Sequence, residues 1–118
     1  MIFVILGGGF GAITRYALGN FVSSKSNSPL PLGTFLINIS GSFLLGVINY
    51  LFLNHSINQS FWLLIGVGFL GAYTTFSTFG YETINLLIQK KISIAVYYVI
   101  LSAILGILFA EIGFHIPI

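Results

Sequence analysis

The chain has 118 residues, of which 57% are hydrophobic and 5% are charged, and its formal net charge is +2. A soluble domain carries about 25% charged residues, so this composition is typical of an integral membrane protein. The small, scattered charge excludes a nucleic-acid partner. The absence of Cys excludes disulfides, thiolate metal sites and cysteine nucleophiles.

Four apolar segments alternate with short polar stretches, and each is long enough to cross a bilayer at about 20 residues per span. Their approximate ranges are 2–22, 32–53, 60–88 and 94–114. The first has no basic region before it and no clear cleavage site, so we interpret it as a span rather than a signal peptide. We expect an all-α membrane protein in which residues 1–118 form a single four-span domain.

The first span contains closely spaced glycines and one basic residue. A dinucleotide-binding glycine motif fits residues 7–12, but no acidic residue follows at the spacing that would hold a ribose. Gly7 and Gly11 are instead typical of close helix packing. Arg15 has two open interpretations: it extends to the cytoplasmic interface, or it attracts an anion at a mouth.

The second span carries a polar stripe, because four of its side chains fall within one quadrant of a helix. These are Thr34, Asn38, Ser42 and Asn49. The stripe predicts either an interhelical hydrogen-bond seam or a wetted track, and both interpretations stay open. The Asn38 amide can donate two hydrogen bonds to an anion.

The third span is 29 residues long, which is longer than one crossing needs, so we expect a break in its Gly- and Thr-rich middle. Residues 68–82 read GFLGAYTTFSTFGYE, with four hydroxyls around two phenylalanines. Each hydroxyl costs free energy in a membrane unless it has a partner, which indicates a path for something polar. A helix that restarts near Thr75 would place four residues on one face: Thr75, Thr78, Phe79 and Glu82.

Phe76 and Phe79 would ordinarily be packing residues, but the hydroxyls beside them favour another role. The positive edge of a benzene ring can face an anion without a full charge that would trap it. Conduction needs binding that is weak enough to release the ion. At the break itself, unwound backbone exposes carbonyl oxygens that need protein or a cation as partner, and Gly71 and Thr74 are placed to supply them.

The fourth span has one mostly small face, formed by Tyr98, Ser102, Gly106 and Ala110 at four-residue spacing. Gly106 and Ala110 favour a tight packing seam. The remaining ionisable groups include Glu82 and Glu111, for which the sequence gives no clear role. They form no metal site or nucleophile–base set, so we do not expect an enzyme.

Lys25, Lys90 and Lys91 all lie in the first and third loops, whereas the second loop has no Lys or Arg. The positive-inside rule therefore predicts that these two loops are cytoplasmic and that both termini are outside.

These stretches together resemble the Fluc/CrcB family of fluoride channels along nearly the whole chain. The likeness lies in GGGFGAITRY, GTFLINISGSFLLG and GFLGAYTTFSTFGYE, in this order within a four-span plan. The resemblance implies a fluoride-selective channel that exports fluoride passively across the bacterial inner or plasma membrane. It also implies an antiparallel, dual-topology dimer with two pores, in contact with membrane lipid.

The resemblance assigns roles to particular residues. It implies an anion pathway of Asn38, Thr75, Phe76, Ser77, Thr78, Phe79, Glu82, Tyr98 and Ser102. It implies a structural Na⁺ at the dimer interface, held by the backbone carbonyls of Gly71 and Thr74, and a structural or vestibular role for Arg15.

The second subunit is either the same chain or an oppositely oriented paralogue. The lysine bias suits a fixed orientation, and hence a paralogue, but both assemblies stay open. The alternative function is a small multidrug transporter of the proton-coupled type. Such proteins carry a glutamate in the first span, where this chain has Arg15 and no acid.

Overall fold

The computed structural model describes residues 1–25, 31–74 and 77–116. In this part of the chain the structure is helical, and four helical segments are long and apolar enough to cross a membrane. They are Ile2–Lys25, Leu32–Leu53, Gln59–Ile88 and Ile92–Phe114. The predicted four-helix membrane fold is therefore confirmed.

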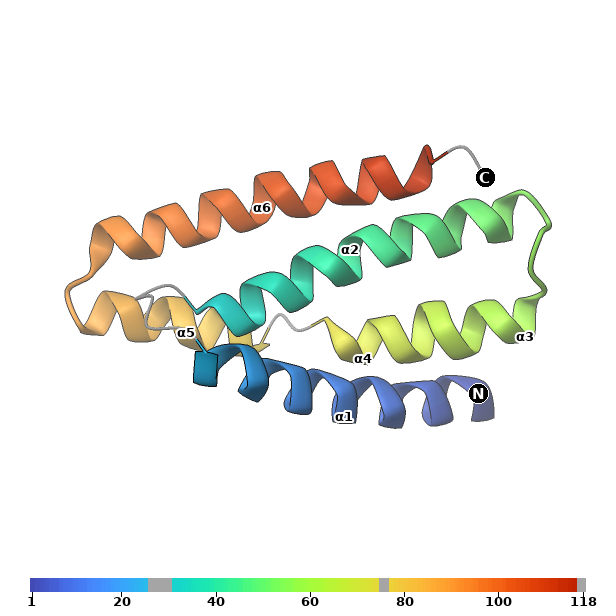
Figure 1. Cartoon of the computed structure of the whole chain (residues 1–118), viewed down its shortest axis with the longest axis horizontal. Helices are drawn as coiled ribbons and strands as arrows, with labels where there is room; N and C mark the ends of the chain where they lie inside the picture. Colours follow the sequence, from blue (N-terminus) through green and yellow to red (C-terminus); the bar gives the residue numbers. More distant parts are fainter. Residues whose placement is uncertain (26–30, 75–76, 117–118) are drawn as a thin grey trace.

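Three of the spans are single helices: α1 (Ile2–Lys25), α2 (Leu32–Leu53) and α6 (Ile92–Phe114) (Figure 1). The third span is divided into α3 (Gln59–Phe61), η1 (Trp62–Leu70), α4 (Gly71–Tyr73) and α5 (Ser77–Ile88). The start of α1 and the end of α6 lie at the same end of the molecule (Figure 1).

The third span changes its helical form and then breaks, and the break was predicted. The segment η1 is a π-helix, a form whose hydrogen bonds span five residues and which often marks functional sites. The chain leaves the helix at Thr74, whose φ of −75° and ψ of 150° are extended. The Thr74 hydroxyl donates to the Leu70 carbonyl at 3.0 Å, a local bond of the kind that competes with helix continuation.

The described part of α5 begins at Ser77. Thr75 and Phe76 lie outside the described residues, so the expected restart near Thr75 stays a prediction.

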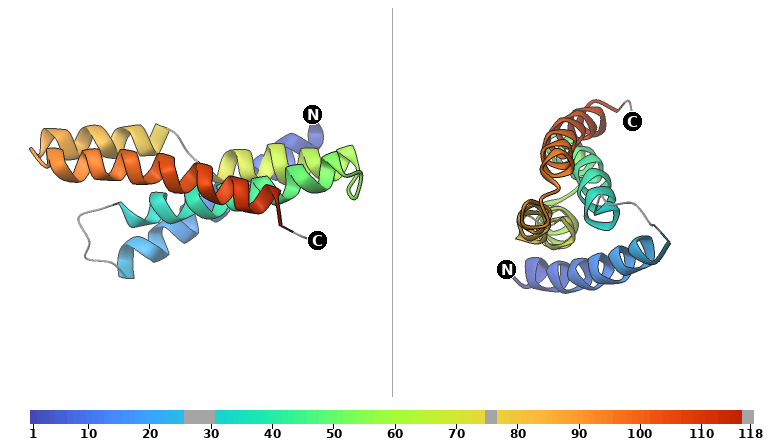
Figure 2. Two further views of the ribbon diagram at one scale, coloured as in Figure 1. Left: turned by 90° about the horizontal axis from the view of Figure 1, so that it is seen from above. Right: turned by 90° about the vertical axis from the view of Figure 1, so that its left-hand side faces the viewer.

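Close glycine contacts hold the helices together, and α2 packs along α6 while α1 packs along η1 (Figure 2). A methyl group at Gly46 would overlap the Ala110 carbonyl, and one at Gly113 would overlap the Phe43 carbonyl. Similarly, Gly7 and Gly11 of α1 lie directly against the backbone of η1. The predicted packing role of these two glycines is confirmed.

The buried core consists of two clusters, one on either side of the break along the third span. Ile37, Leu70 and Tyr73 form the first cluster. Leu86, Ala95 and Tyr98 form the second. Between these clusters the third span is free to leave its helical path without exposing the core.

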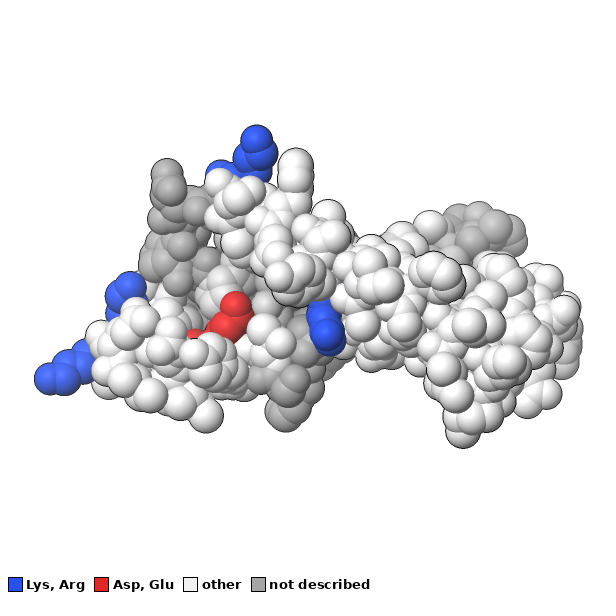
Figure 3. Space-filling view, turned by 90° about the horizontal axis from the view of Figure 1, so that it is seen from below, with Lys and Arg blue, Asp and Glu red and all other residues white. Residues whose placement is uncertain are grey.

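Basic side chains lie toward one end of the molecule, and the opposite end of the face in Figure 3 shows none. Lys25 is in the last turn of α1, and Lys90 and Lys91 lie in the turn between α5 and α6. The positive-inside rule predicts that this end is cytoplasmic, and this orientation stays a prediction.

We expect Gly113→Ala to lower the free energy of unfolding by about 1–3 kcal/mol, because the new methyl group collides with the Phe43 carbonyl at a packed interface. Gly106→Ala is the matched control in the same helix, since its methyl group would meet the Ser42 hydroxyl at an ordinary 3.7 Å. Unfolding in mixed detergent micelles measures both. Equal stability of the two variants would contradict the packing role of Gly113.

Candidate functional site

A cavity of about 370 Å³ lies between α2, α5 and α6, next to the break, and is here termed the central cavity. Its polar lining comes from three helical segments: Asn38 and Ser42 of α2, Thr74 at the end of α4, and Ser102 of α6. Its apolar lining residues are Leu45, Phe79, Val99, Ala103 and Gly106. None of these described lining residues carries a formal charge, so the cavity offers neutral donors and an aromatic ring.

The Ser102 hydroxyl is the most informative group in this cavity. Its oxygen is buried and has no hydrogen-bond partner within the part of the chain that the structure describes. An unsatisfied buried hydroxyl costs about 1–3 kcal/mol, so a protein retains one where a ligand or water completes it. The neighbouring Ser42 hydroxyl is already engaged, because it donates to the Asn38 carbonyl at 2.7 Å.

The ring of Phe79 forms part of the wall of the central cavity, and the ring of Tyr98 packs behind it. Phe79 lines the cavity, and its ring centroid lies 4.9 Å from that of Tyr98, with the planes tilted by 44°. Tyr98 is fully buried behind it, at 0% exposure. The Tyr98 hydroxyl donates to Oε1 of Glu82 at 3.3 Å, which leads from this wall to a second cavity.

The second cavity, of about 260 Å³, is termed the mouth cavity because it lies toward one end of the molecule, between the last turns of α1, the start of α2 and the start of α5. Arg15, Thr34, Thr78 and Glu82 are among its polar lining residues. The Thr34 and Tyr98 hydroxyls both hydrogen-bond to the Glu82 side chain. Nη1 of Arg15 donates to the Ala72 carbonyl at 3.1 Å, so the guanidinium reaches from α1 to the end of α4.

The structure brings most of the predicted site residues together, but into two cavities instead of one track. Asn38, Phe79 and Ser102 line the central cavity, whereas Thr78, Glu82 and Arg15 line the mouth cavity. Thr75, Phe76 and the side chain of Ser77 lie outside the described residues. Gly71 lines neither cavity and is exposed on the single chain.

The residues of the polar stripe of α2 do not share one environment: some line a cavity and one belongs to an interhelical hydrogen bond. Ser42 and Asn38 face the central cavity, and the buried Thr34 faces the mouth cavity. Asn49 instead belongs to a packing seam, because its Oδ1 accepts a hydrogen bond from Nε1 of Trp62 at 3.0 Å. Ser42 and Thr34 were not among the predicted pathway residues, although their position in the stripe was the available signal.

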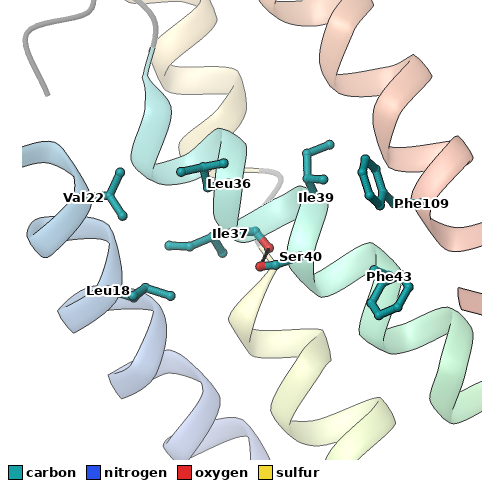
Figure 4. Close-up of a pocket in the computed structure, with 8 residues that line it drawn as sticks. All are labelled: Leu18, Val22, Leu36, Ile37, Ile39, Ser40, Phe43 and Phe109. Atoms are coloured by element: carbon teal, nitrogen blue, oxygen red, sulfur yellow. Dashed lines mark hydrogen bonds between the residues drawn. The ribbon is translucent and has the colours of Figure 1, made fainter.

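A larger cavity, of about 510 Å³, opens between α1, α2 and α6 and is shown in Figure 4. Its lining is apolar except for Ser40, whose hydroxyl is 3.0 Å from the Tyr73 hydroxyl. Figure 4 shows Leu18 and Val22 extending from α1 toward α2 on one side of it. With one polar side chain already engaged, this groove cannot replace the hydration shell of an ion.

Comparisons with known proteins match the chain to one family and to several relatives of similar length. Residues 2–114 match the family described as "CrcB-like protein, Camphor Resistance (CrcB)". A "Fluoride-specific ion channel FluC 2" of Bacillus cereus is 46% identical over 112 residues, which cover 95% of this chain and 92% of the relative. The protein of the same name from Clostridium acetobutylicum is 46% identical over 103 residues, with 87% and 85% covered. A "Fluoride-specific ion channel FluC" of Oceanobacillus iheyensis is 43% identical over 119 residues, with 100% and 91% covered.

We expect Tyr98→Phe to lower the free energy of unfolding by about 0.6–1.7 kcal/mol, the range measured for hydrogen bonds between membrane helices. The reason is that the variant keeps the ring beside Phe79 but removes the donor to Glu82. Tyr97→Phe is the control, since this neighbouring tyrosine is 56% exposed. A Tyr98 variant as stable as the Tyr97 variant would show that the bond to Glu82 contributes nothing.

Proposed function

The chain belongs to the CrcB-like protein family, and from this premise we propose that it is a fluoride-selective ion channel of the bacterial plasma membrane. The observation that supports this function best is the Ser102 hydroxyl, which has no partner among the described residues and lies in a cavity lined by neutral donors and the Phe79 ring. The matching family is one of channels, which is not an enzyme class.

Fluoride is small and strongly hydrated, so a pore must replace its water shell with directed donors. In the central cavity these donors are the Ser102 hydroxyl and the Asn38 amide, and Phe79 can turn a positive ring edge toward the ion. All three are neutral, so each interaction is favourable but weak enough to release the ion to the next site.

The ion enters from the mouth cavity and passes the Phe79–Tyr98 pair to reach the central cavity. Thr78 and Glu82 line the first part of this path, and Ser102 lines the second. Thr75, Phe76 and Ser77 complete it by their place in the family motif. Transport is passive export, because an inside-negative potential supplies about 2.3 kcal/mol per charge per 100 mV to an outgoing anion.

A second subunit would close the central cavity. Val99, on its lining, is 38% exposed on the single chain, so the chain does not cover its own cavity completely. In a bilayer the polar groups inside would otherwise face lipid, where they have no partner. We propose an antiparallel dimer with two pores, in which the partner covers each cavity.

We also propose that the carbonyls of Gly71 and Thr74 hold a structural Na⁺ at the centre of this dimer. The donor set suits it, since the end of a helix presents carbonyl oxygens and the negative end of the dipole. Gly71 is exposed and no described residue outside its own helix lies within 4 Å of its Cβ position, which leaves room for a second copy to approach. The described residues contain no group of three His, Cys, Asp or Glu, so an ion here would be bound by neutral oxygens.

We expect purified protein in liposomes to release fluoride but not chloride, without a proton gradient, and Ser102→Ala to reduce the fluoride flux by about tenfold through the loss of one donor to the ion. The stability of the variant should not fall, because the hydroxyl loses no partner in the described part of the chain. Ser93→Ala, at an exposed position of the same helix, is the control.

Because the second subunit is either the same chain or a paralogue, flux is measured on two preparations. One contains the chain alone, and the other contains the chain co-expressed with a relative whose lysines lie in its second loop. Absence of fluoride flux from both preparations would refute the proposed function. Normal flux together with lower stability of Ser102→Ala would refute the role of this hydroxyl.

Mapping the termini in cells decides which subunit completes the dimer. With Lys25, Lys90 and Lys91 at one end and no Lys or Arg in the second loop, we expect a single orientation with both termini outside. A single orientation requires an oppositely inserted paralogue for an antiparallel dimer. Equal labelling of the termini on both sides of the membrane would instead indicate a dual-topology homodimer.

A further inference from the structure

The end of α4 is held by a different contact at each of three consecutive residues. The Ala72 carbonyl accepts a hydrogen bond from Arg15 of α1 at 3.1 Å. The Tyr73 hydroxyl lies 3.0 Å from the Ser40 hydroxyl of α2. The methyl group of Thr74 occupies the space that a side chain at residue 41 would need, so Gly41 forms a notch for it.

Arg15 reaches Ala72 because glycines bring α1 close to the third span. Methyl groups at Gly7 and Gly11 would overlap the carbonyls of Leu64 and Phe69, so the two backbones are in direct contact. Residues four apart lie on one face of a helix, and Arg15 follows Gly11 at this spacing. The face that packs on η1 therefore ends in a guanidinium at the point where α4 ends.

The chemistry of this contact is that of a helix cap. The last carbonyls of a helix have no partner within the helix, and a cation near them is stabilised by the helix dipole. Inside a bilayer water cannot supply the missing donor. A planar guanidinium can bind the carbonyl with one N–H group and keep the others for the mouth cavity, which it lines.

We propose that Arg15 is a positioning residue that fixes the end of α4, and with it Thr74 in the wall of the central cavity, instead of serving mainly as the charge that attracts the anion. This inference rests on the proposed channel function for its flux readout. An ionised Glu82 on the same mouth cavity would offset the charge of Arg15 toward an incoming anion. On the face of α1 that packs on η1, the residues four and eight positions before Arg15 are Gly11 and Gly7, which have no side chain that could bind the Ala72 carbonyl in its place.

The test separates the bond from the charge with two variants and one control. Arg15→Gln removes the charge and is too short to keep the contact. Gly11→Ala keeps Arg15 and its charge, but its methyl group would overlap the Phe69 carbonyl and move α1 away. Gly9→Ala is the matched control on the same helix, because nothing lies within 4 Å of its Cβ position.

Hydrogen–deuterium exchange is measured in nanodiscs on the peptide that contains Ala72 to Thr74, where the Thr74 amide bonds to the Leu70 carbonyl. We expect both Arg15→Gln and Gly11→Ala to exchange faster by about tenfold, the effect of one lost hydrogen bond to a charged group on local opening. Both should lower the maximal fluoride flux and leave the half-saturating fluoride concentration unchanged, and Gly9→Ala should match the parent chain.

A charge that only attracts the anion gives the opposite pattern. Arg15→Gln would raise the half-saturating fluoride concentration without faster exchange, and Gly11→Ala would behave like Gly9→Ala. If Gly11→Ala does not fold, unchanged exchange in Arg15→Gln alone overturns the proposal. Hydrogen–deuterium exchange needs no fluoride. Absence of flux from the parent chain would therefore refute the channel function, and the exchange rates would still decide the role of Arg15.

Discussion

The structure depends on one constraint: a polar backbone group inside a bilayer must have a protein partner, because the hydrocarbon core holds no water. The third span meets this constraint along η1 and then leaves its helical path at Thr74. A helix end at this depth is stable only where neighbouring helices supply donors and cover it. Arg15 binds the Ala72 carbonyl from the side of α1, and Ser40 binds the Tyr73 hydroxyl from the side of α2.

Glycines make these contacts possible, which connects the composition of the chain to its site. A guanidinium or a serine hydroxyl reaches the break only if its helix lies almost in backbone contact with the third span. Gly11 provides that approach for α1, and Gly41 provides it for α2. These glycines, which have no side chain, therefore set the distances between the polar side chains and the break.

The sequence predicted the features that follow from hydrophobicity and spacing. Four apolar runs gave the spans, and the extra length of the third with its Gly- and Thr-rich middle gave the break. It could not give the π-helical form of η1, because this segment is apolar on all sides and its sequence therefore shows no hydrophobic period. Nor could it separate Asn49 from the polar stripe of α2, since its partner Trp62 lies on the next span. Arg15 kept two interpretations for the same reason: its acceptor is a backbone carbonyl 57 residues away, which no side-chain pattern reveals.

The distribution of charge over the two cavities reconciles selectivity with release. A full positive charge 4 Å from an anion contributes about 4 kcal/mol at an effective dielectric constant of 20, which would slow release by about a thousandfold. A neutral hydrogen bond contributes about 1 kcal/mol. Arg15 and Glu82 stay in the mouth cavity, while the central cavity presents Asn38 and Ser102. Among the described residues the Ser102 hydroxyl has no partner, so in the proposed channel an ion in the central cavity would complete its hydrogen bonding without a full charge to hold it.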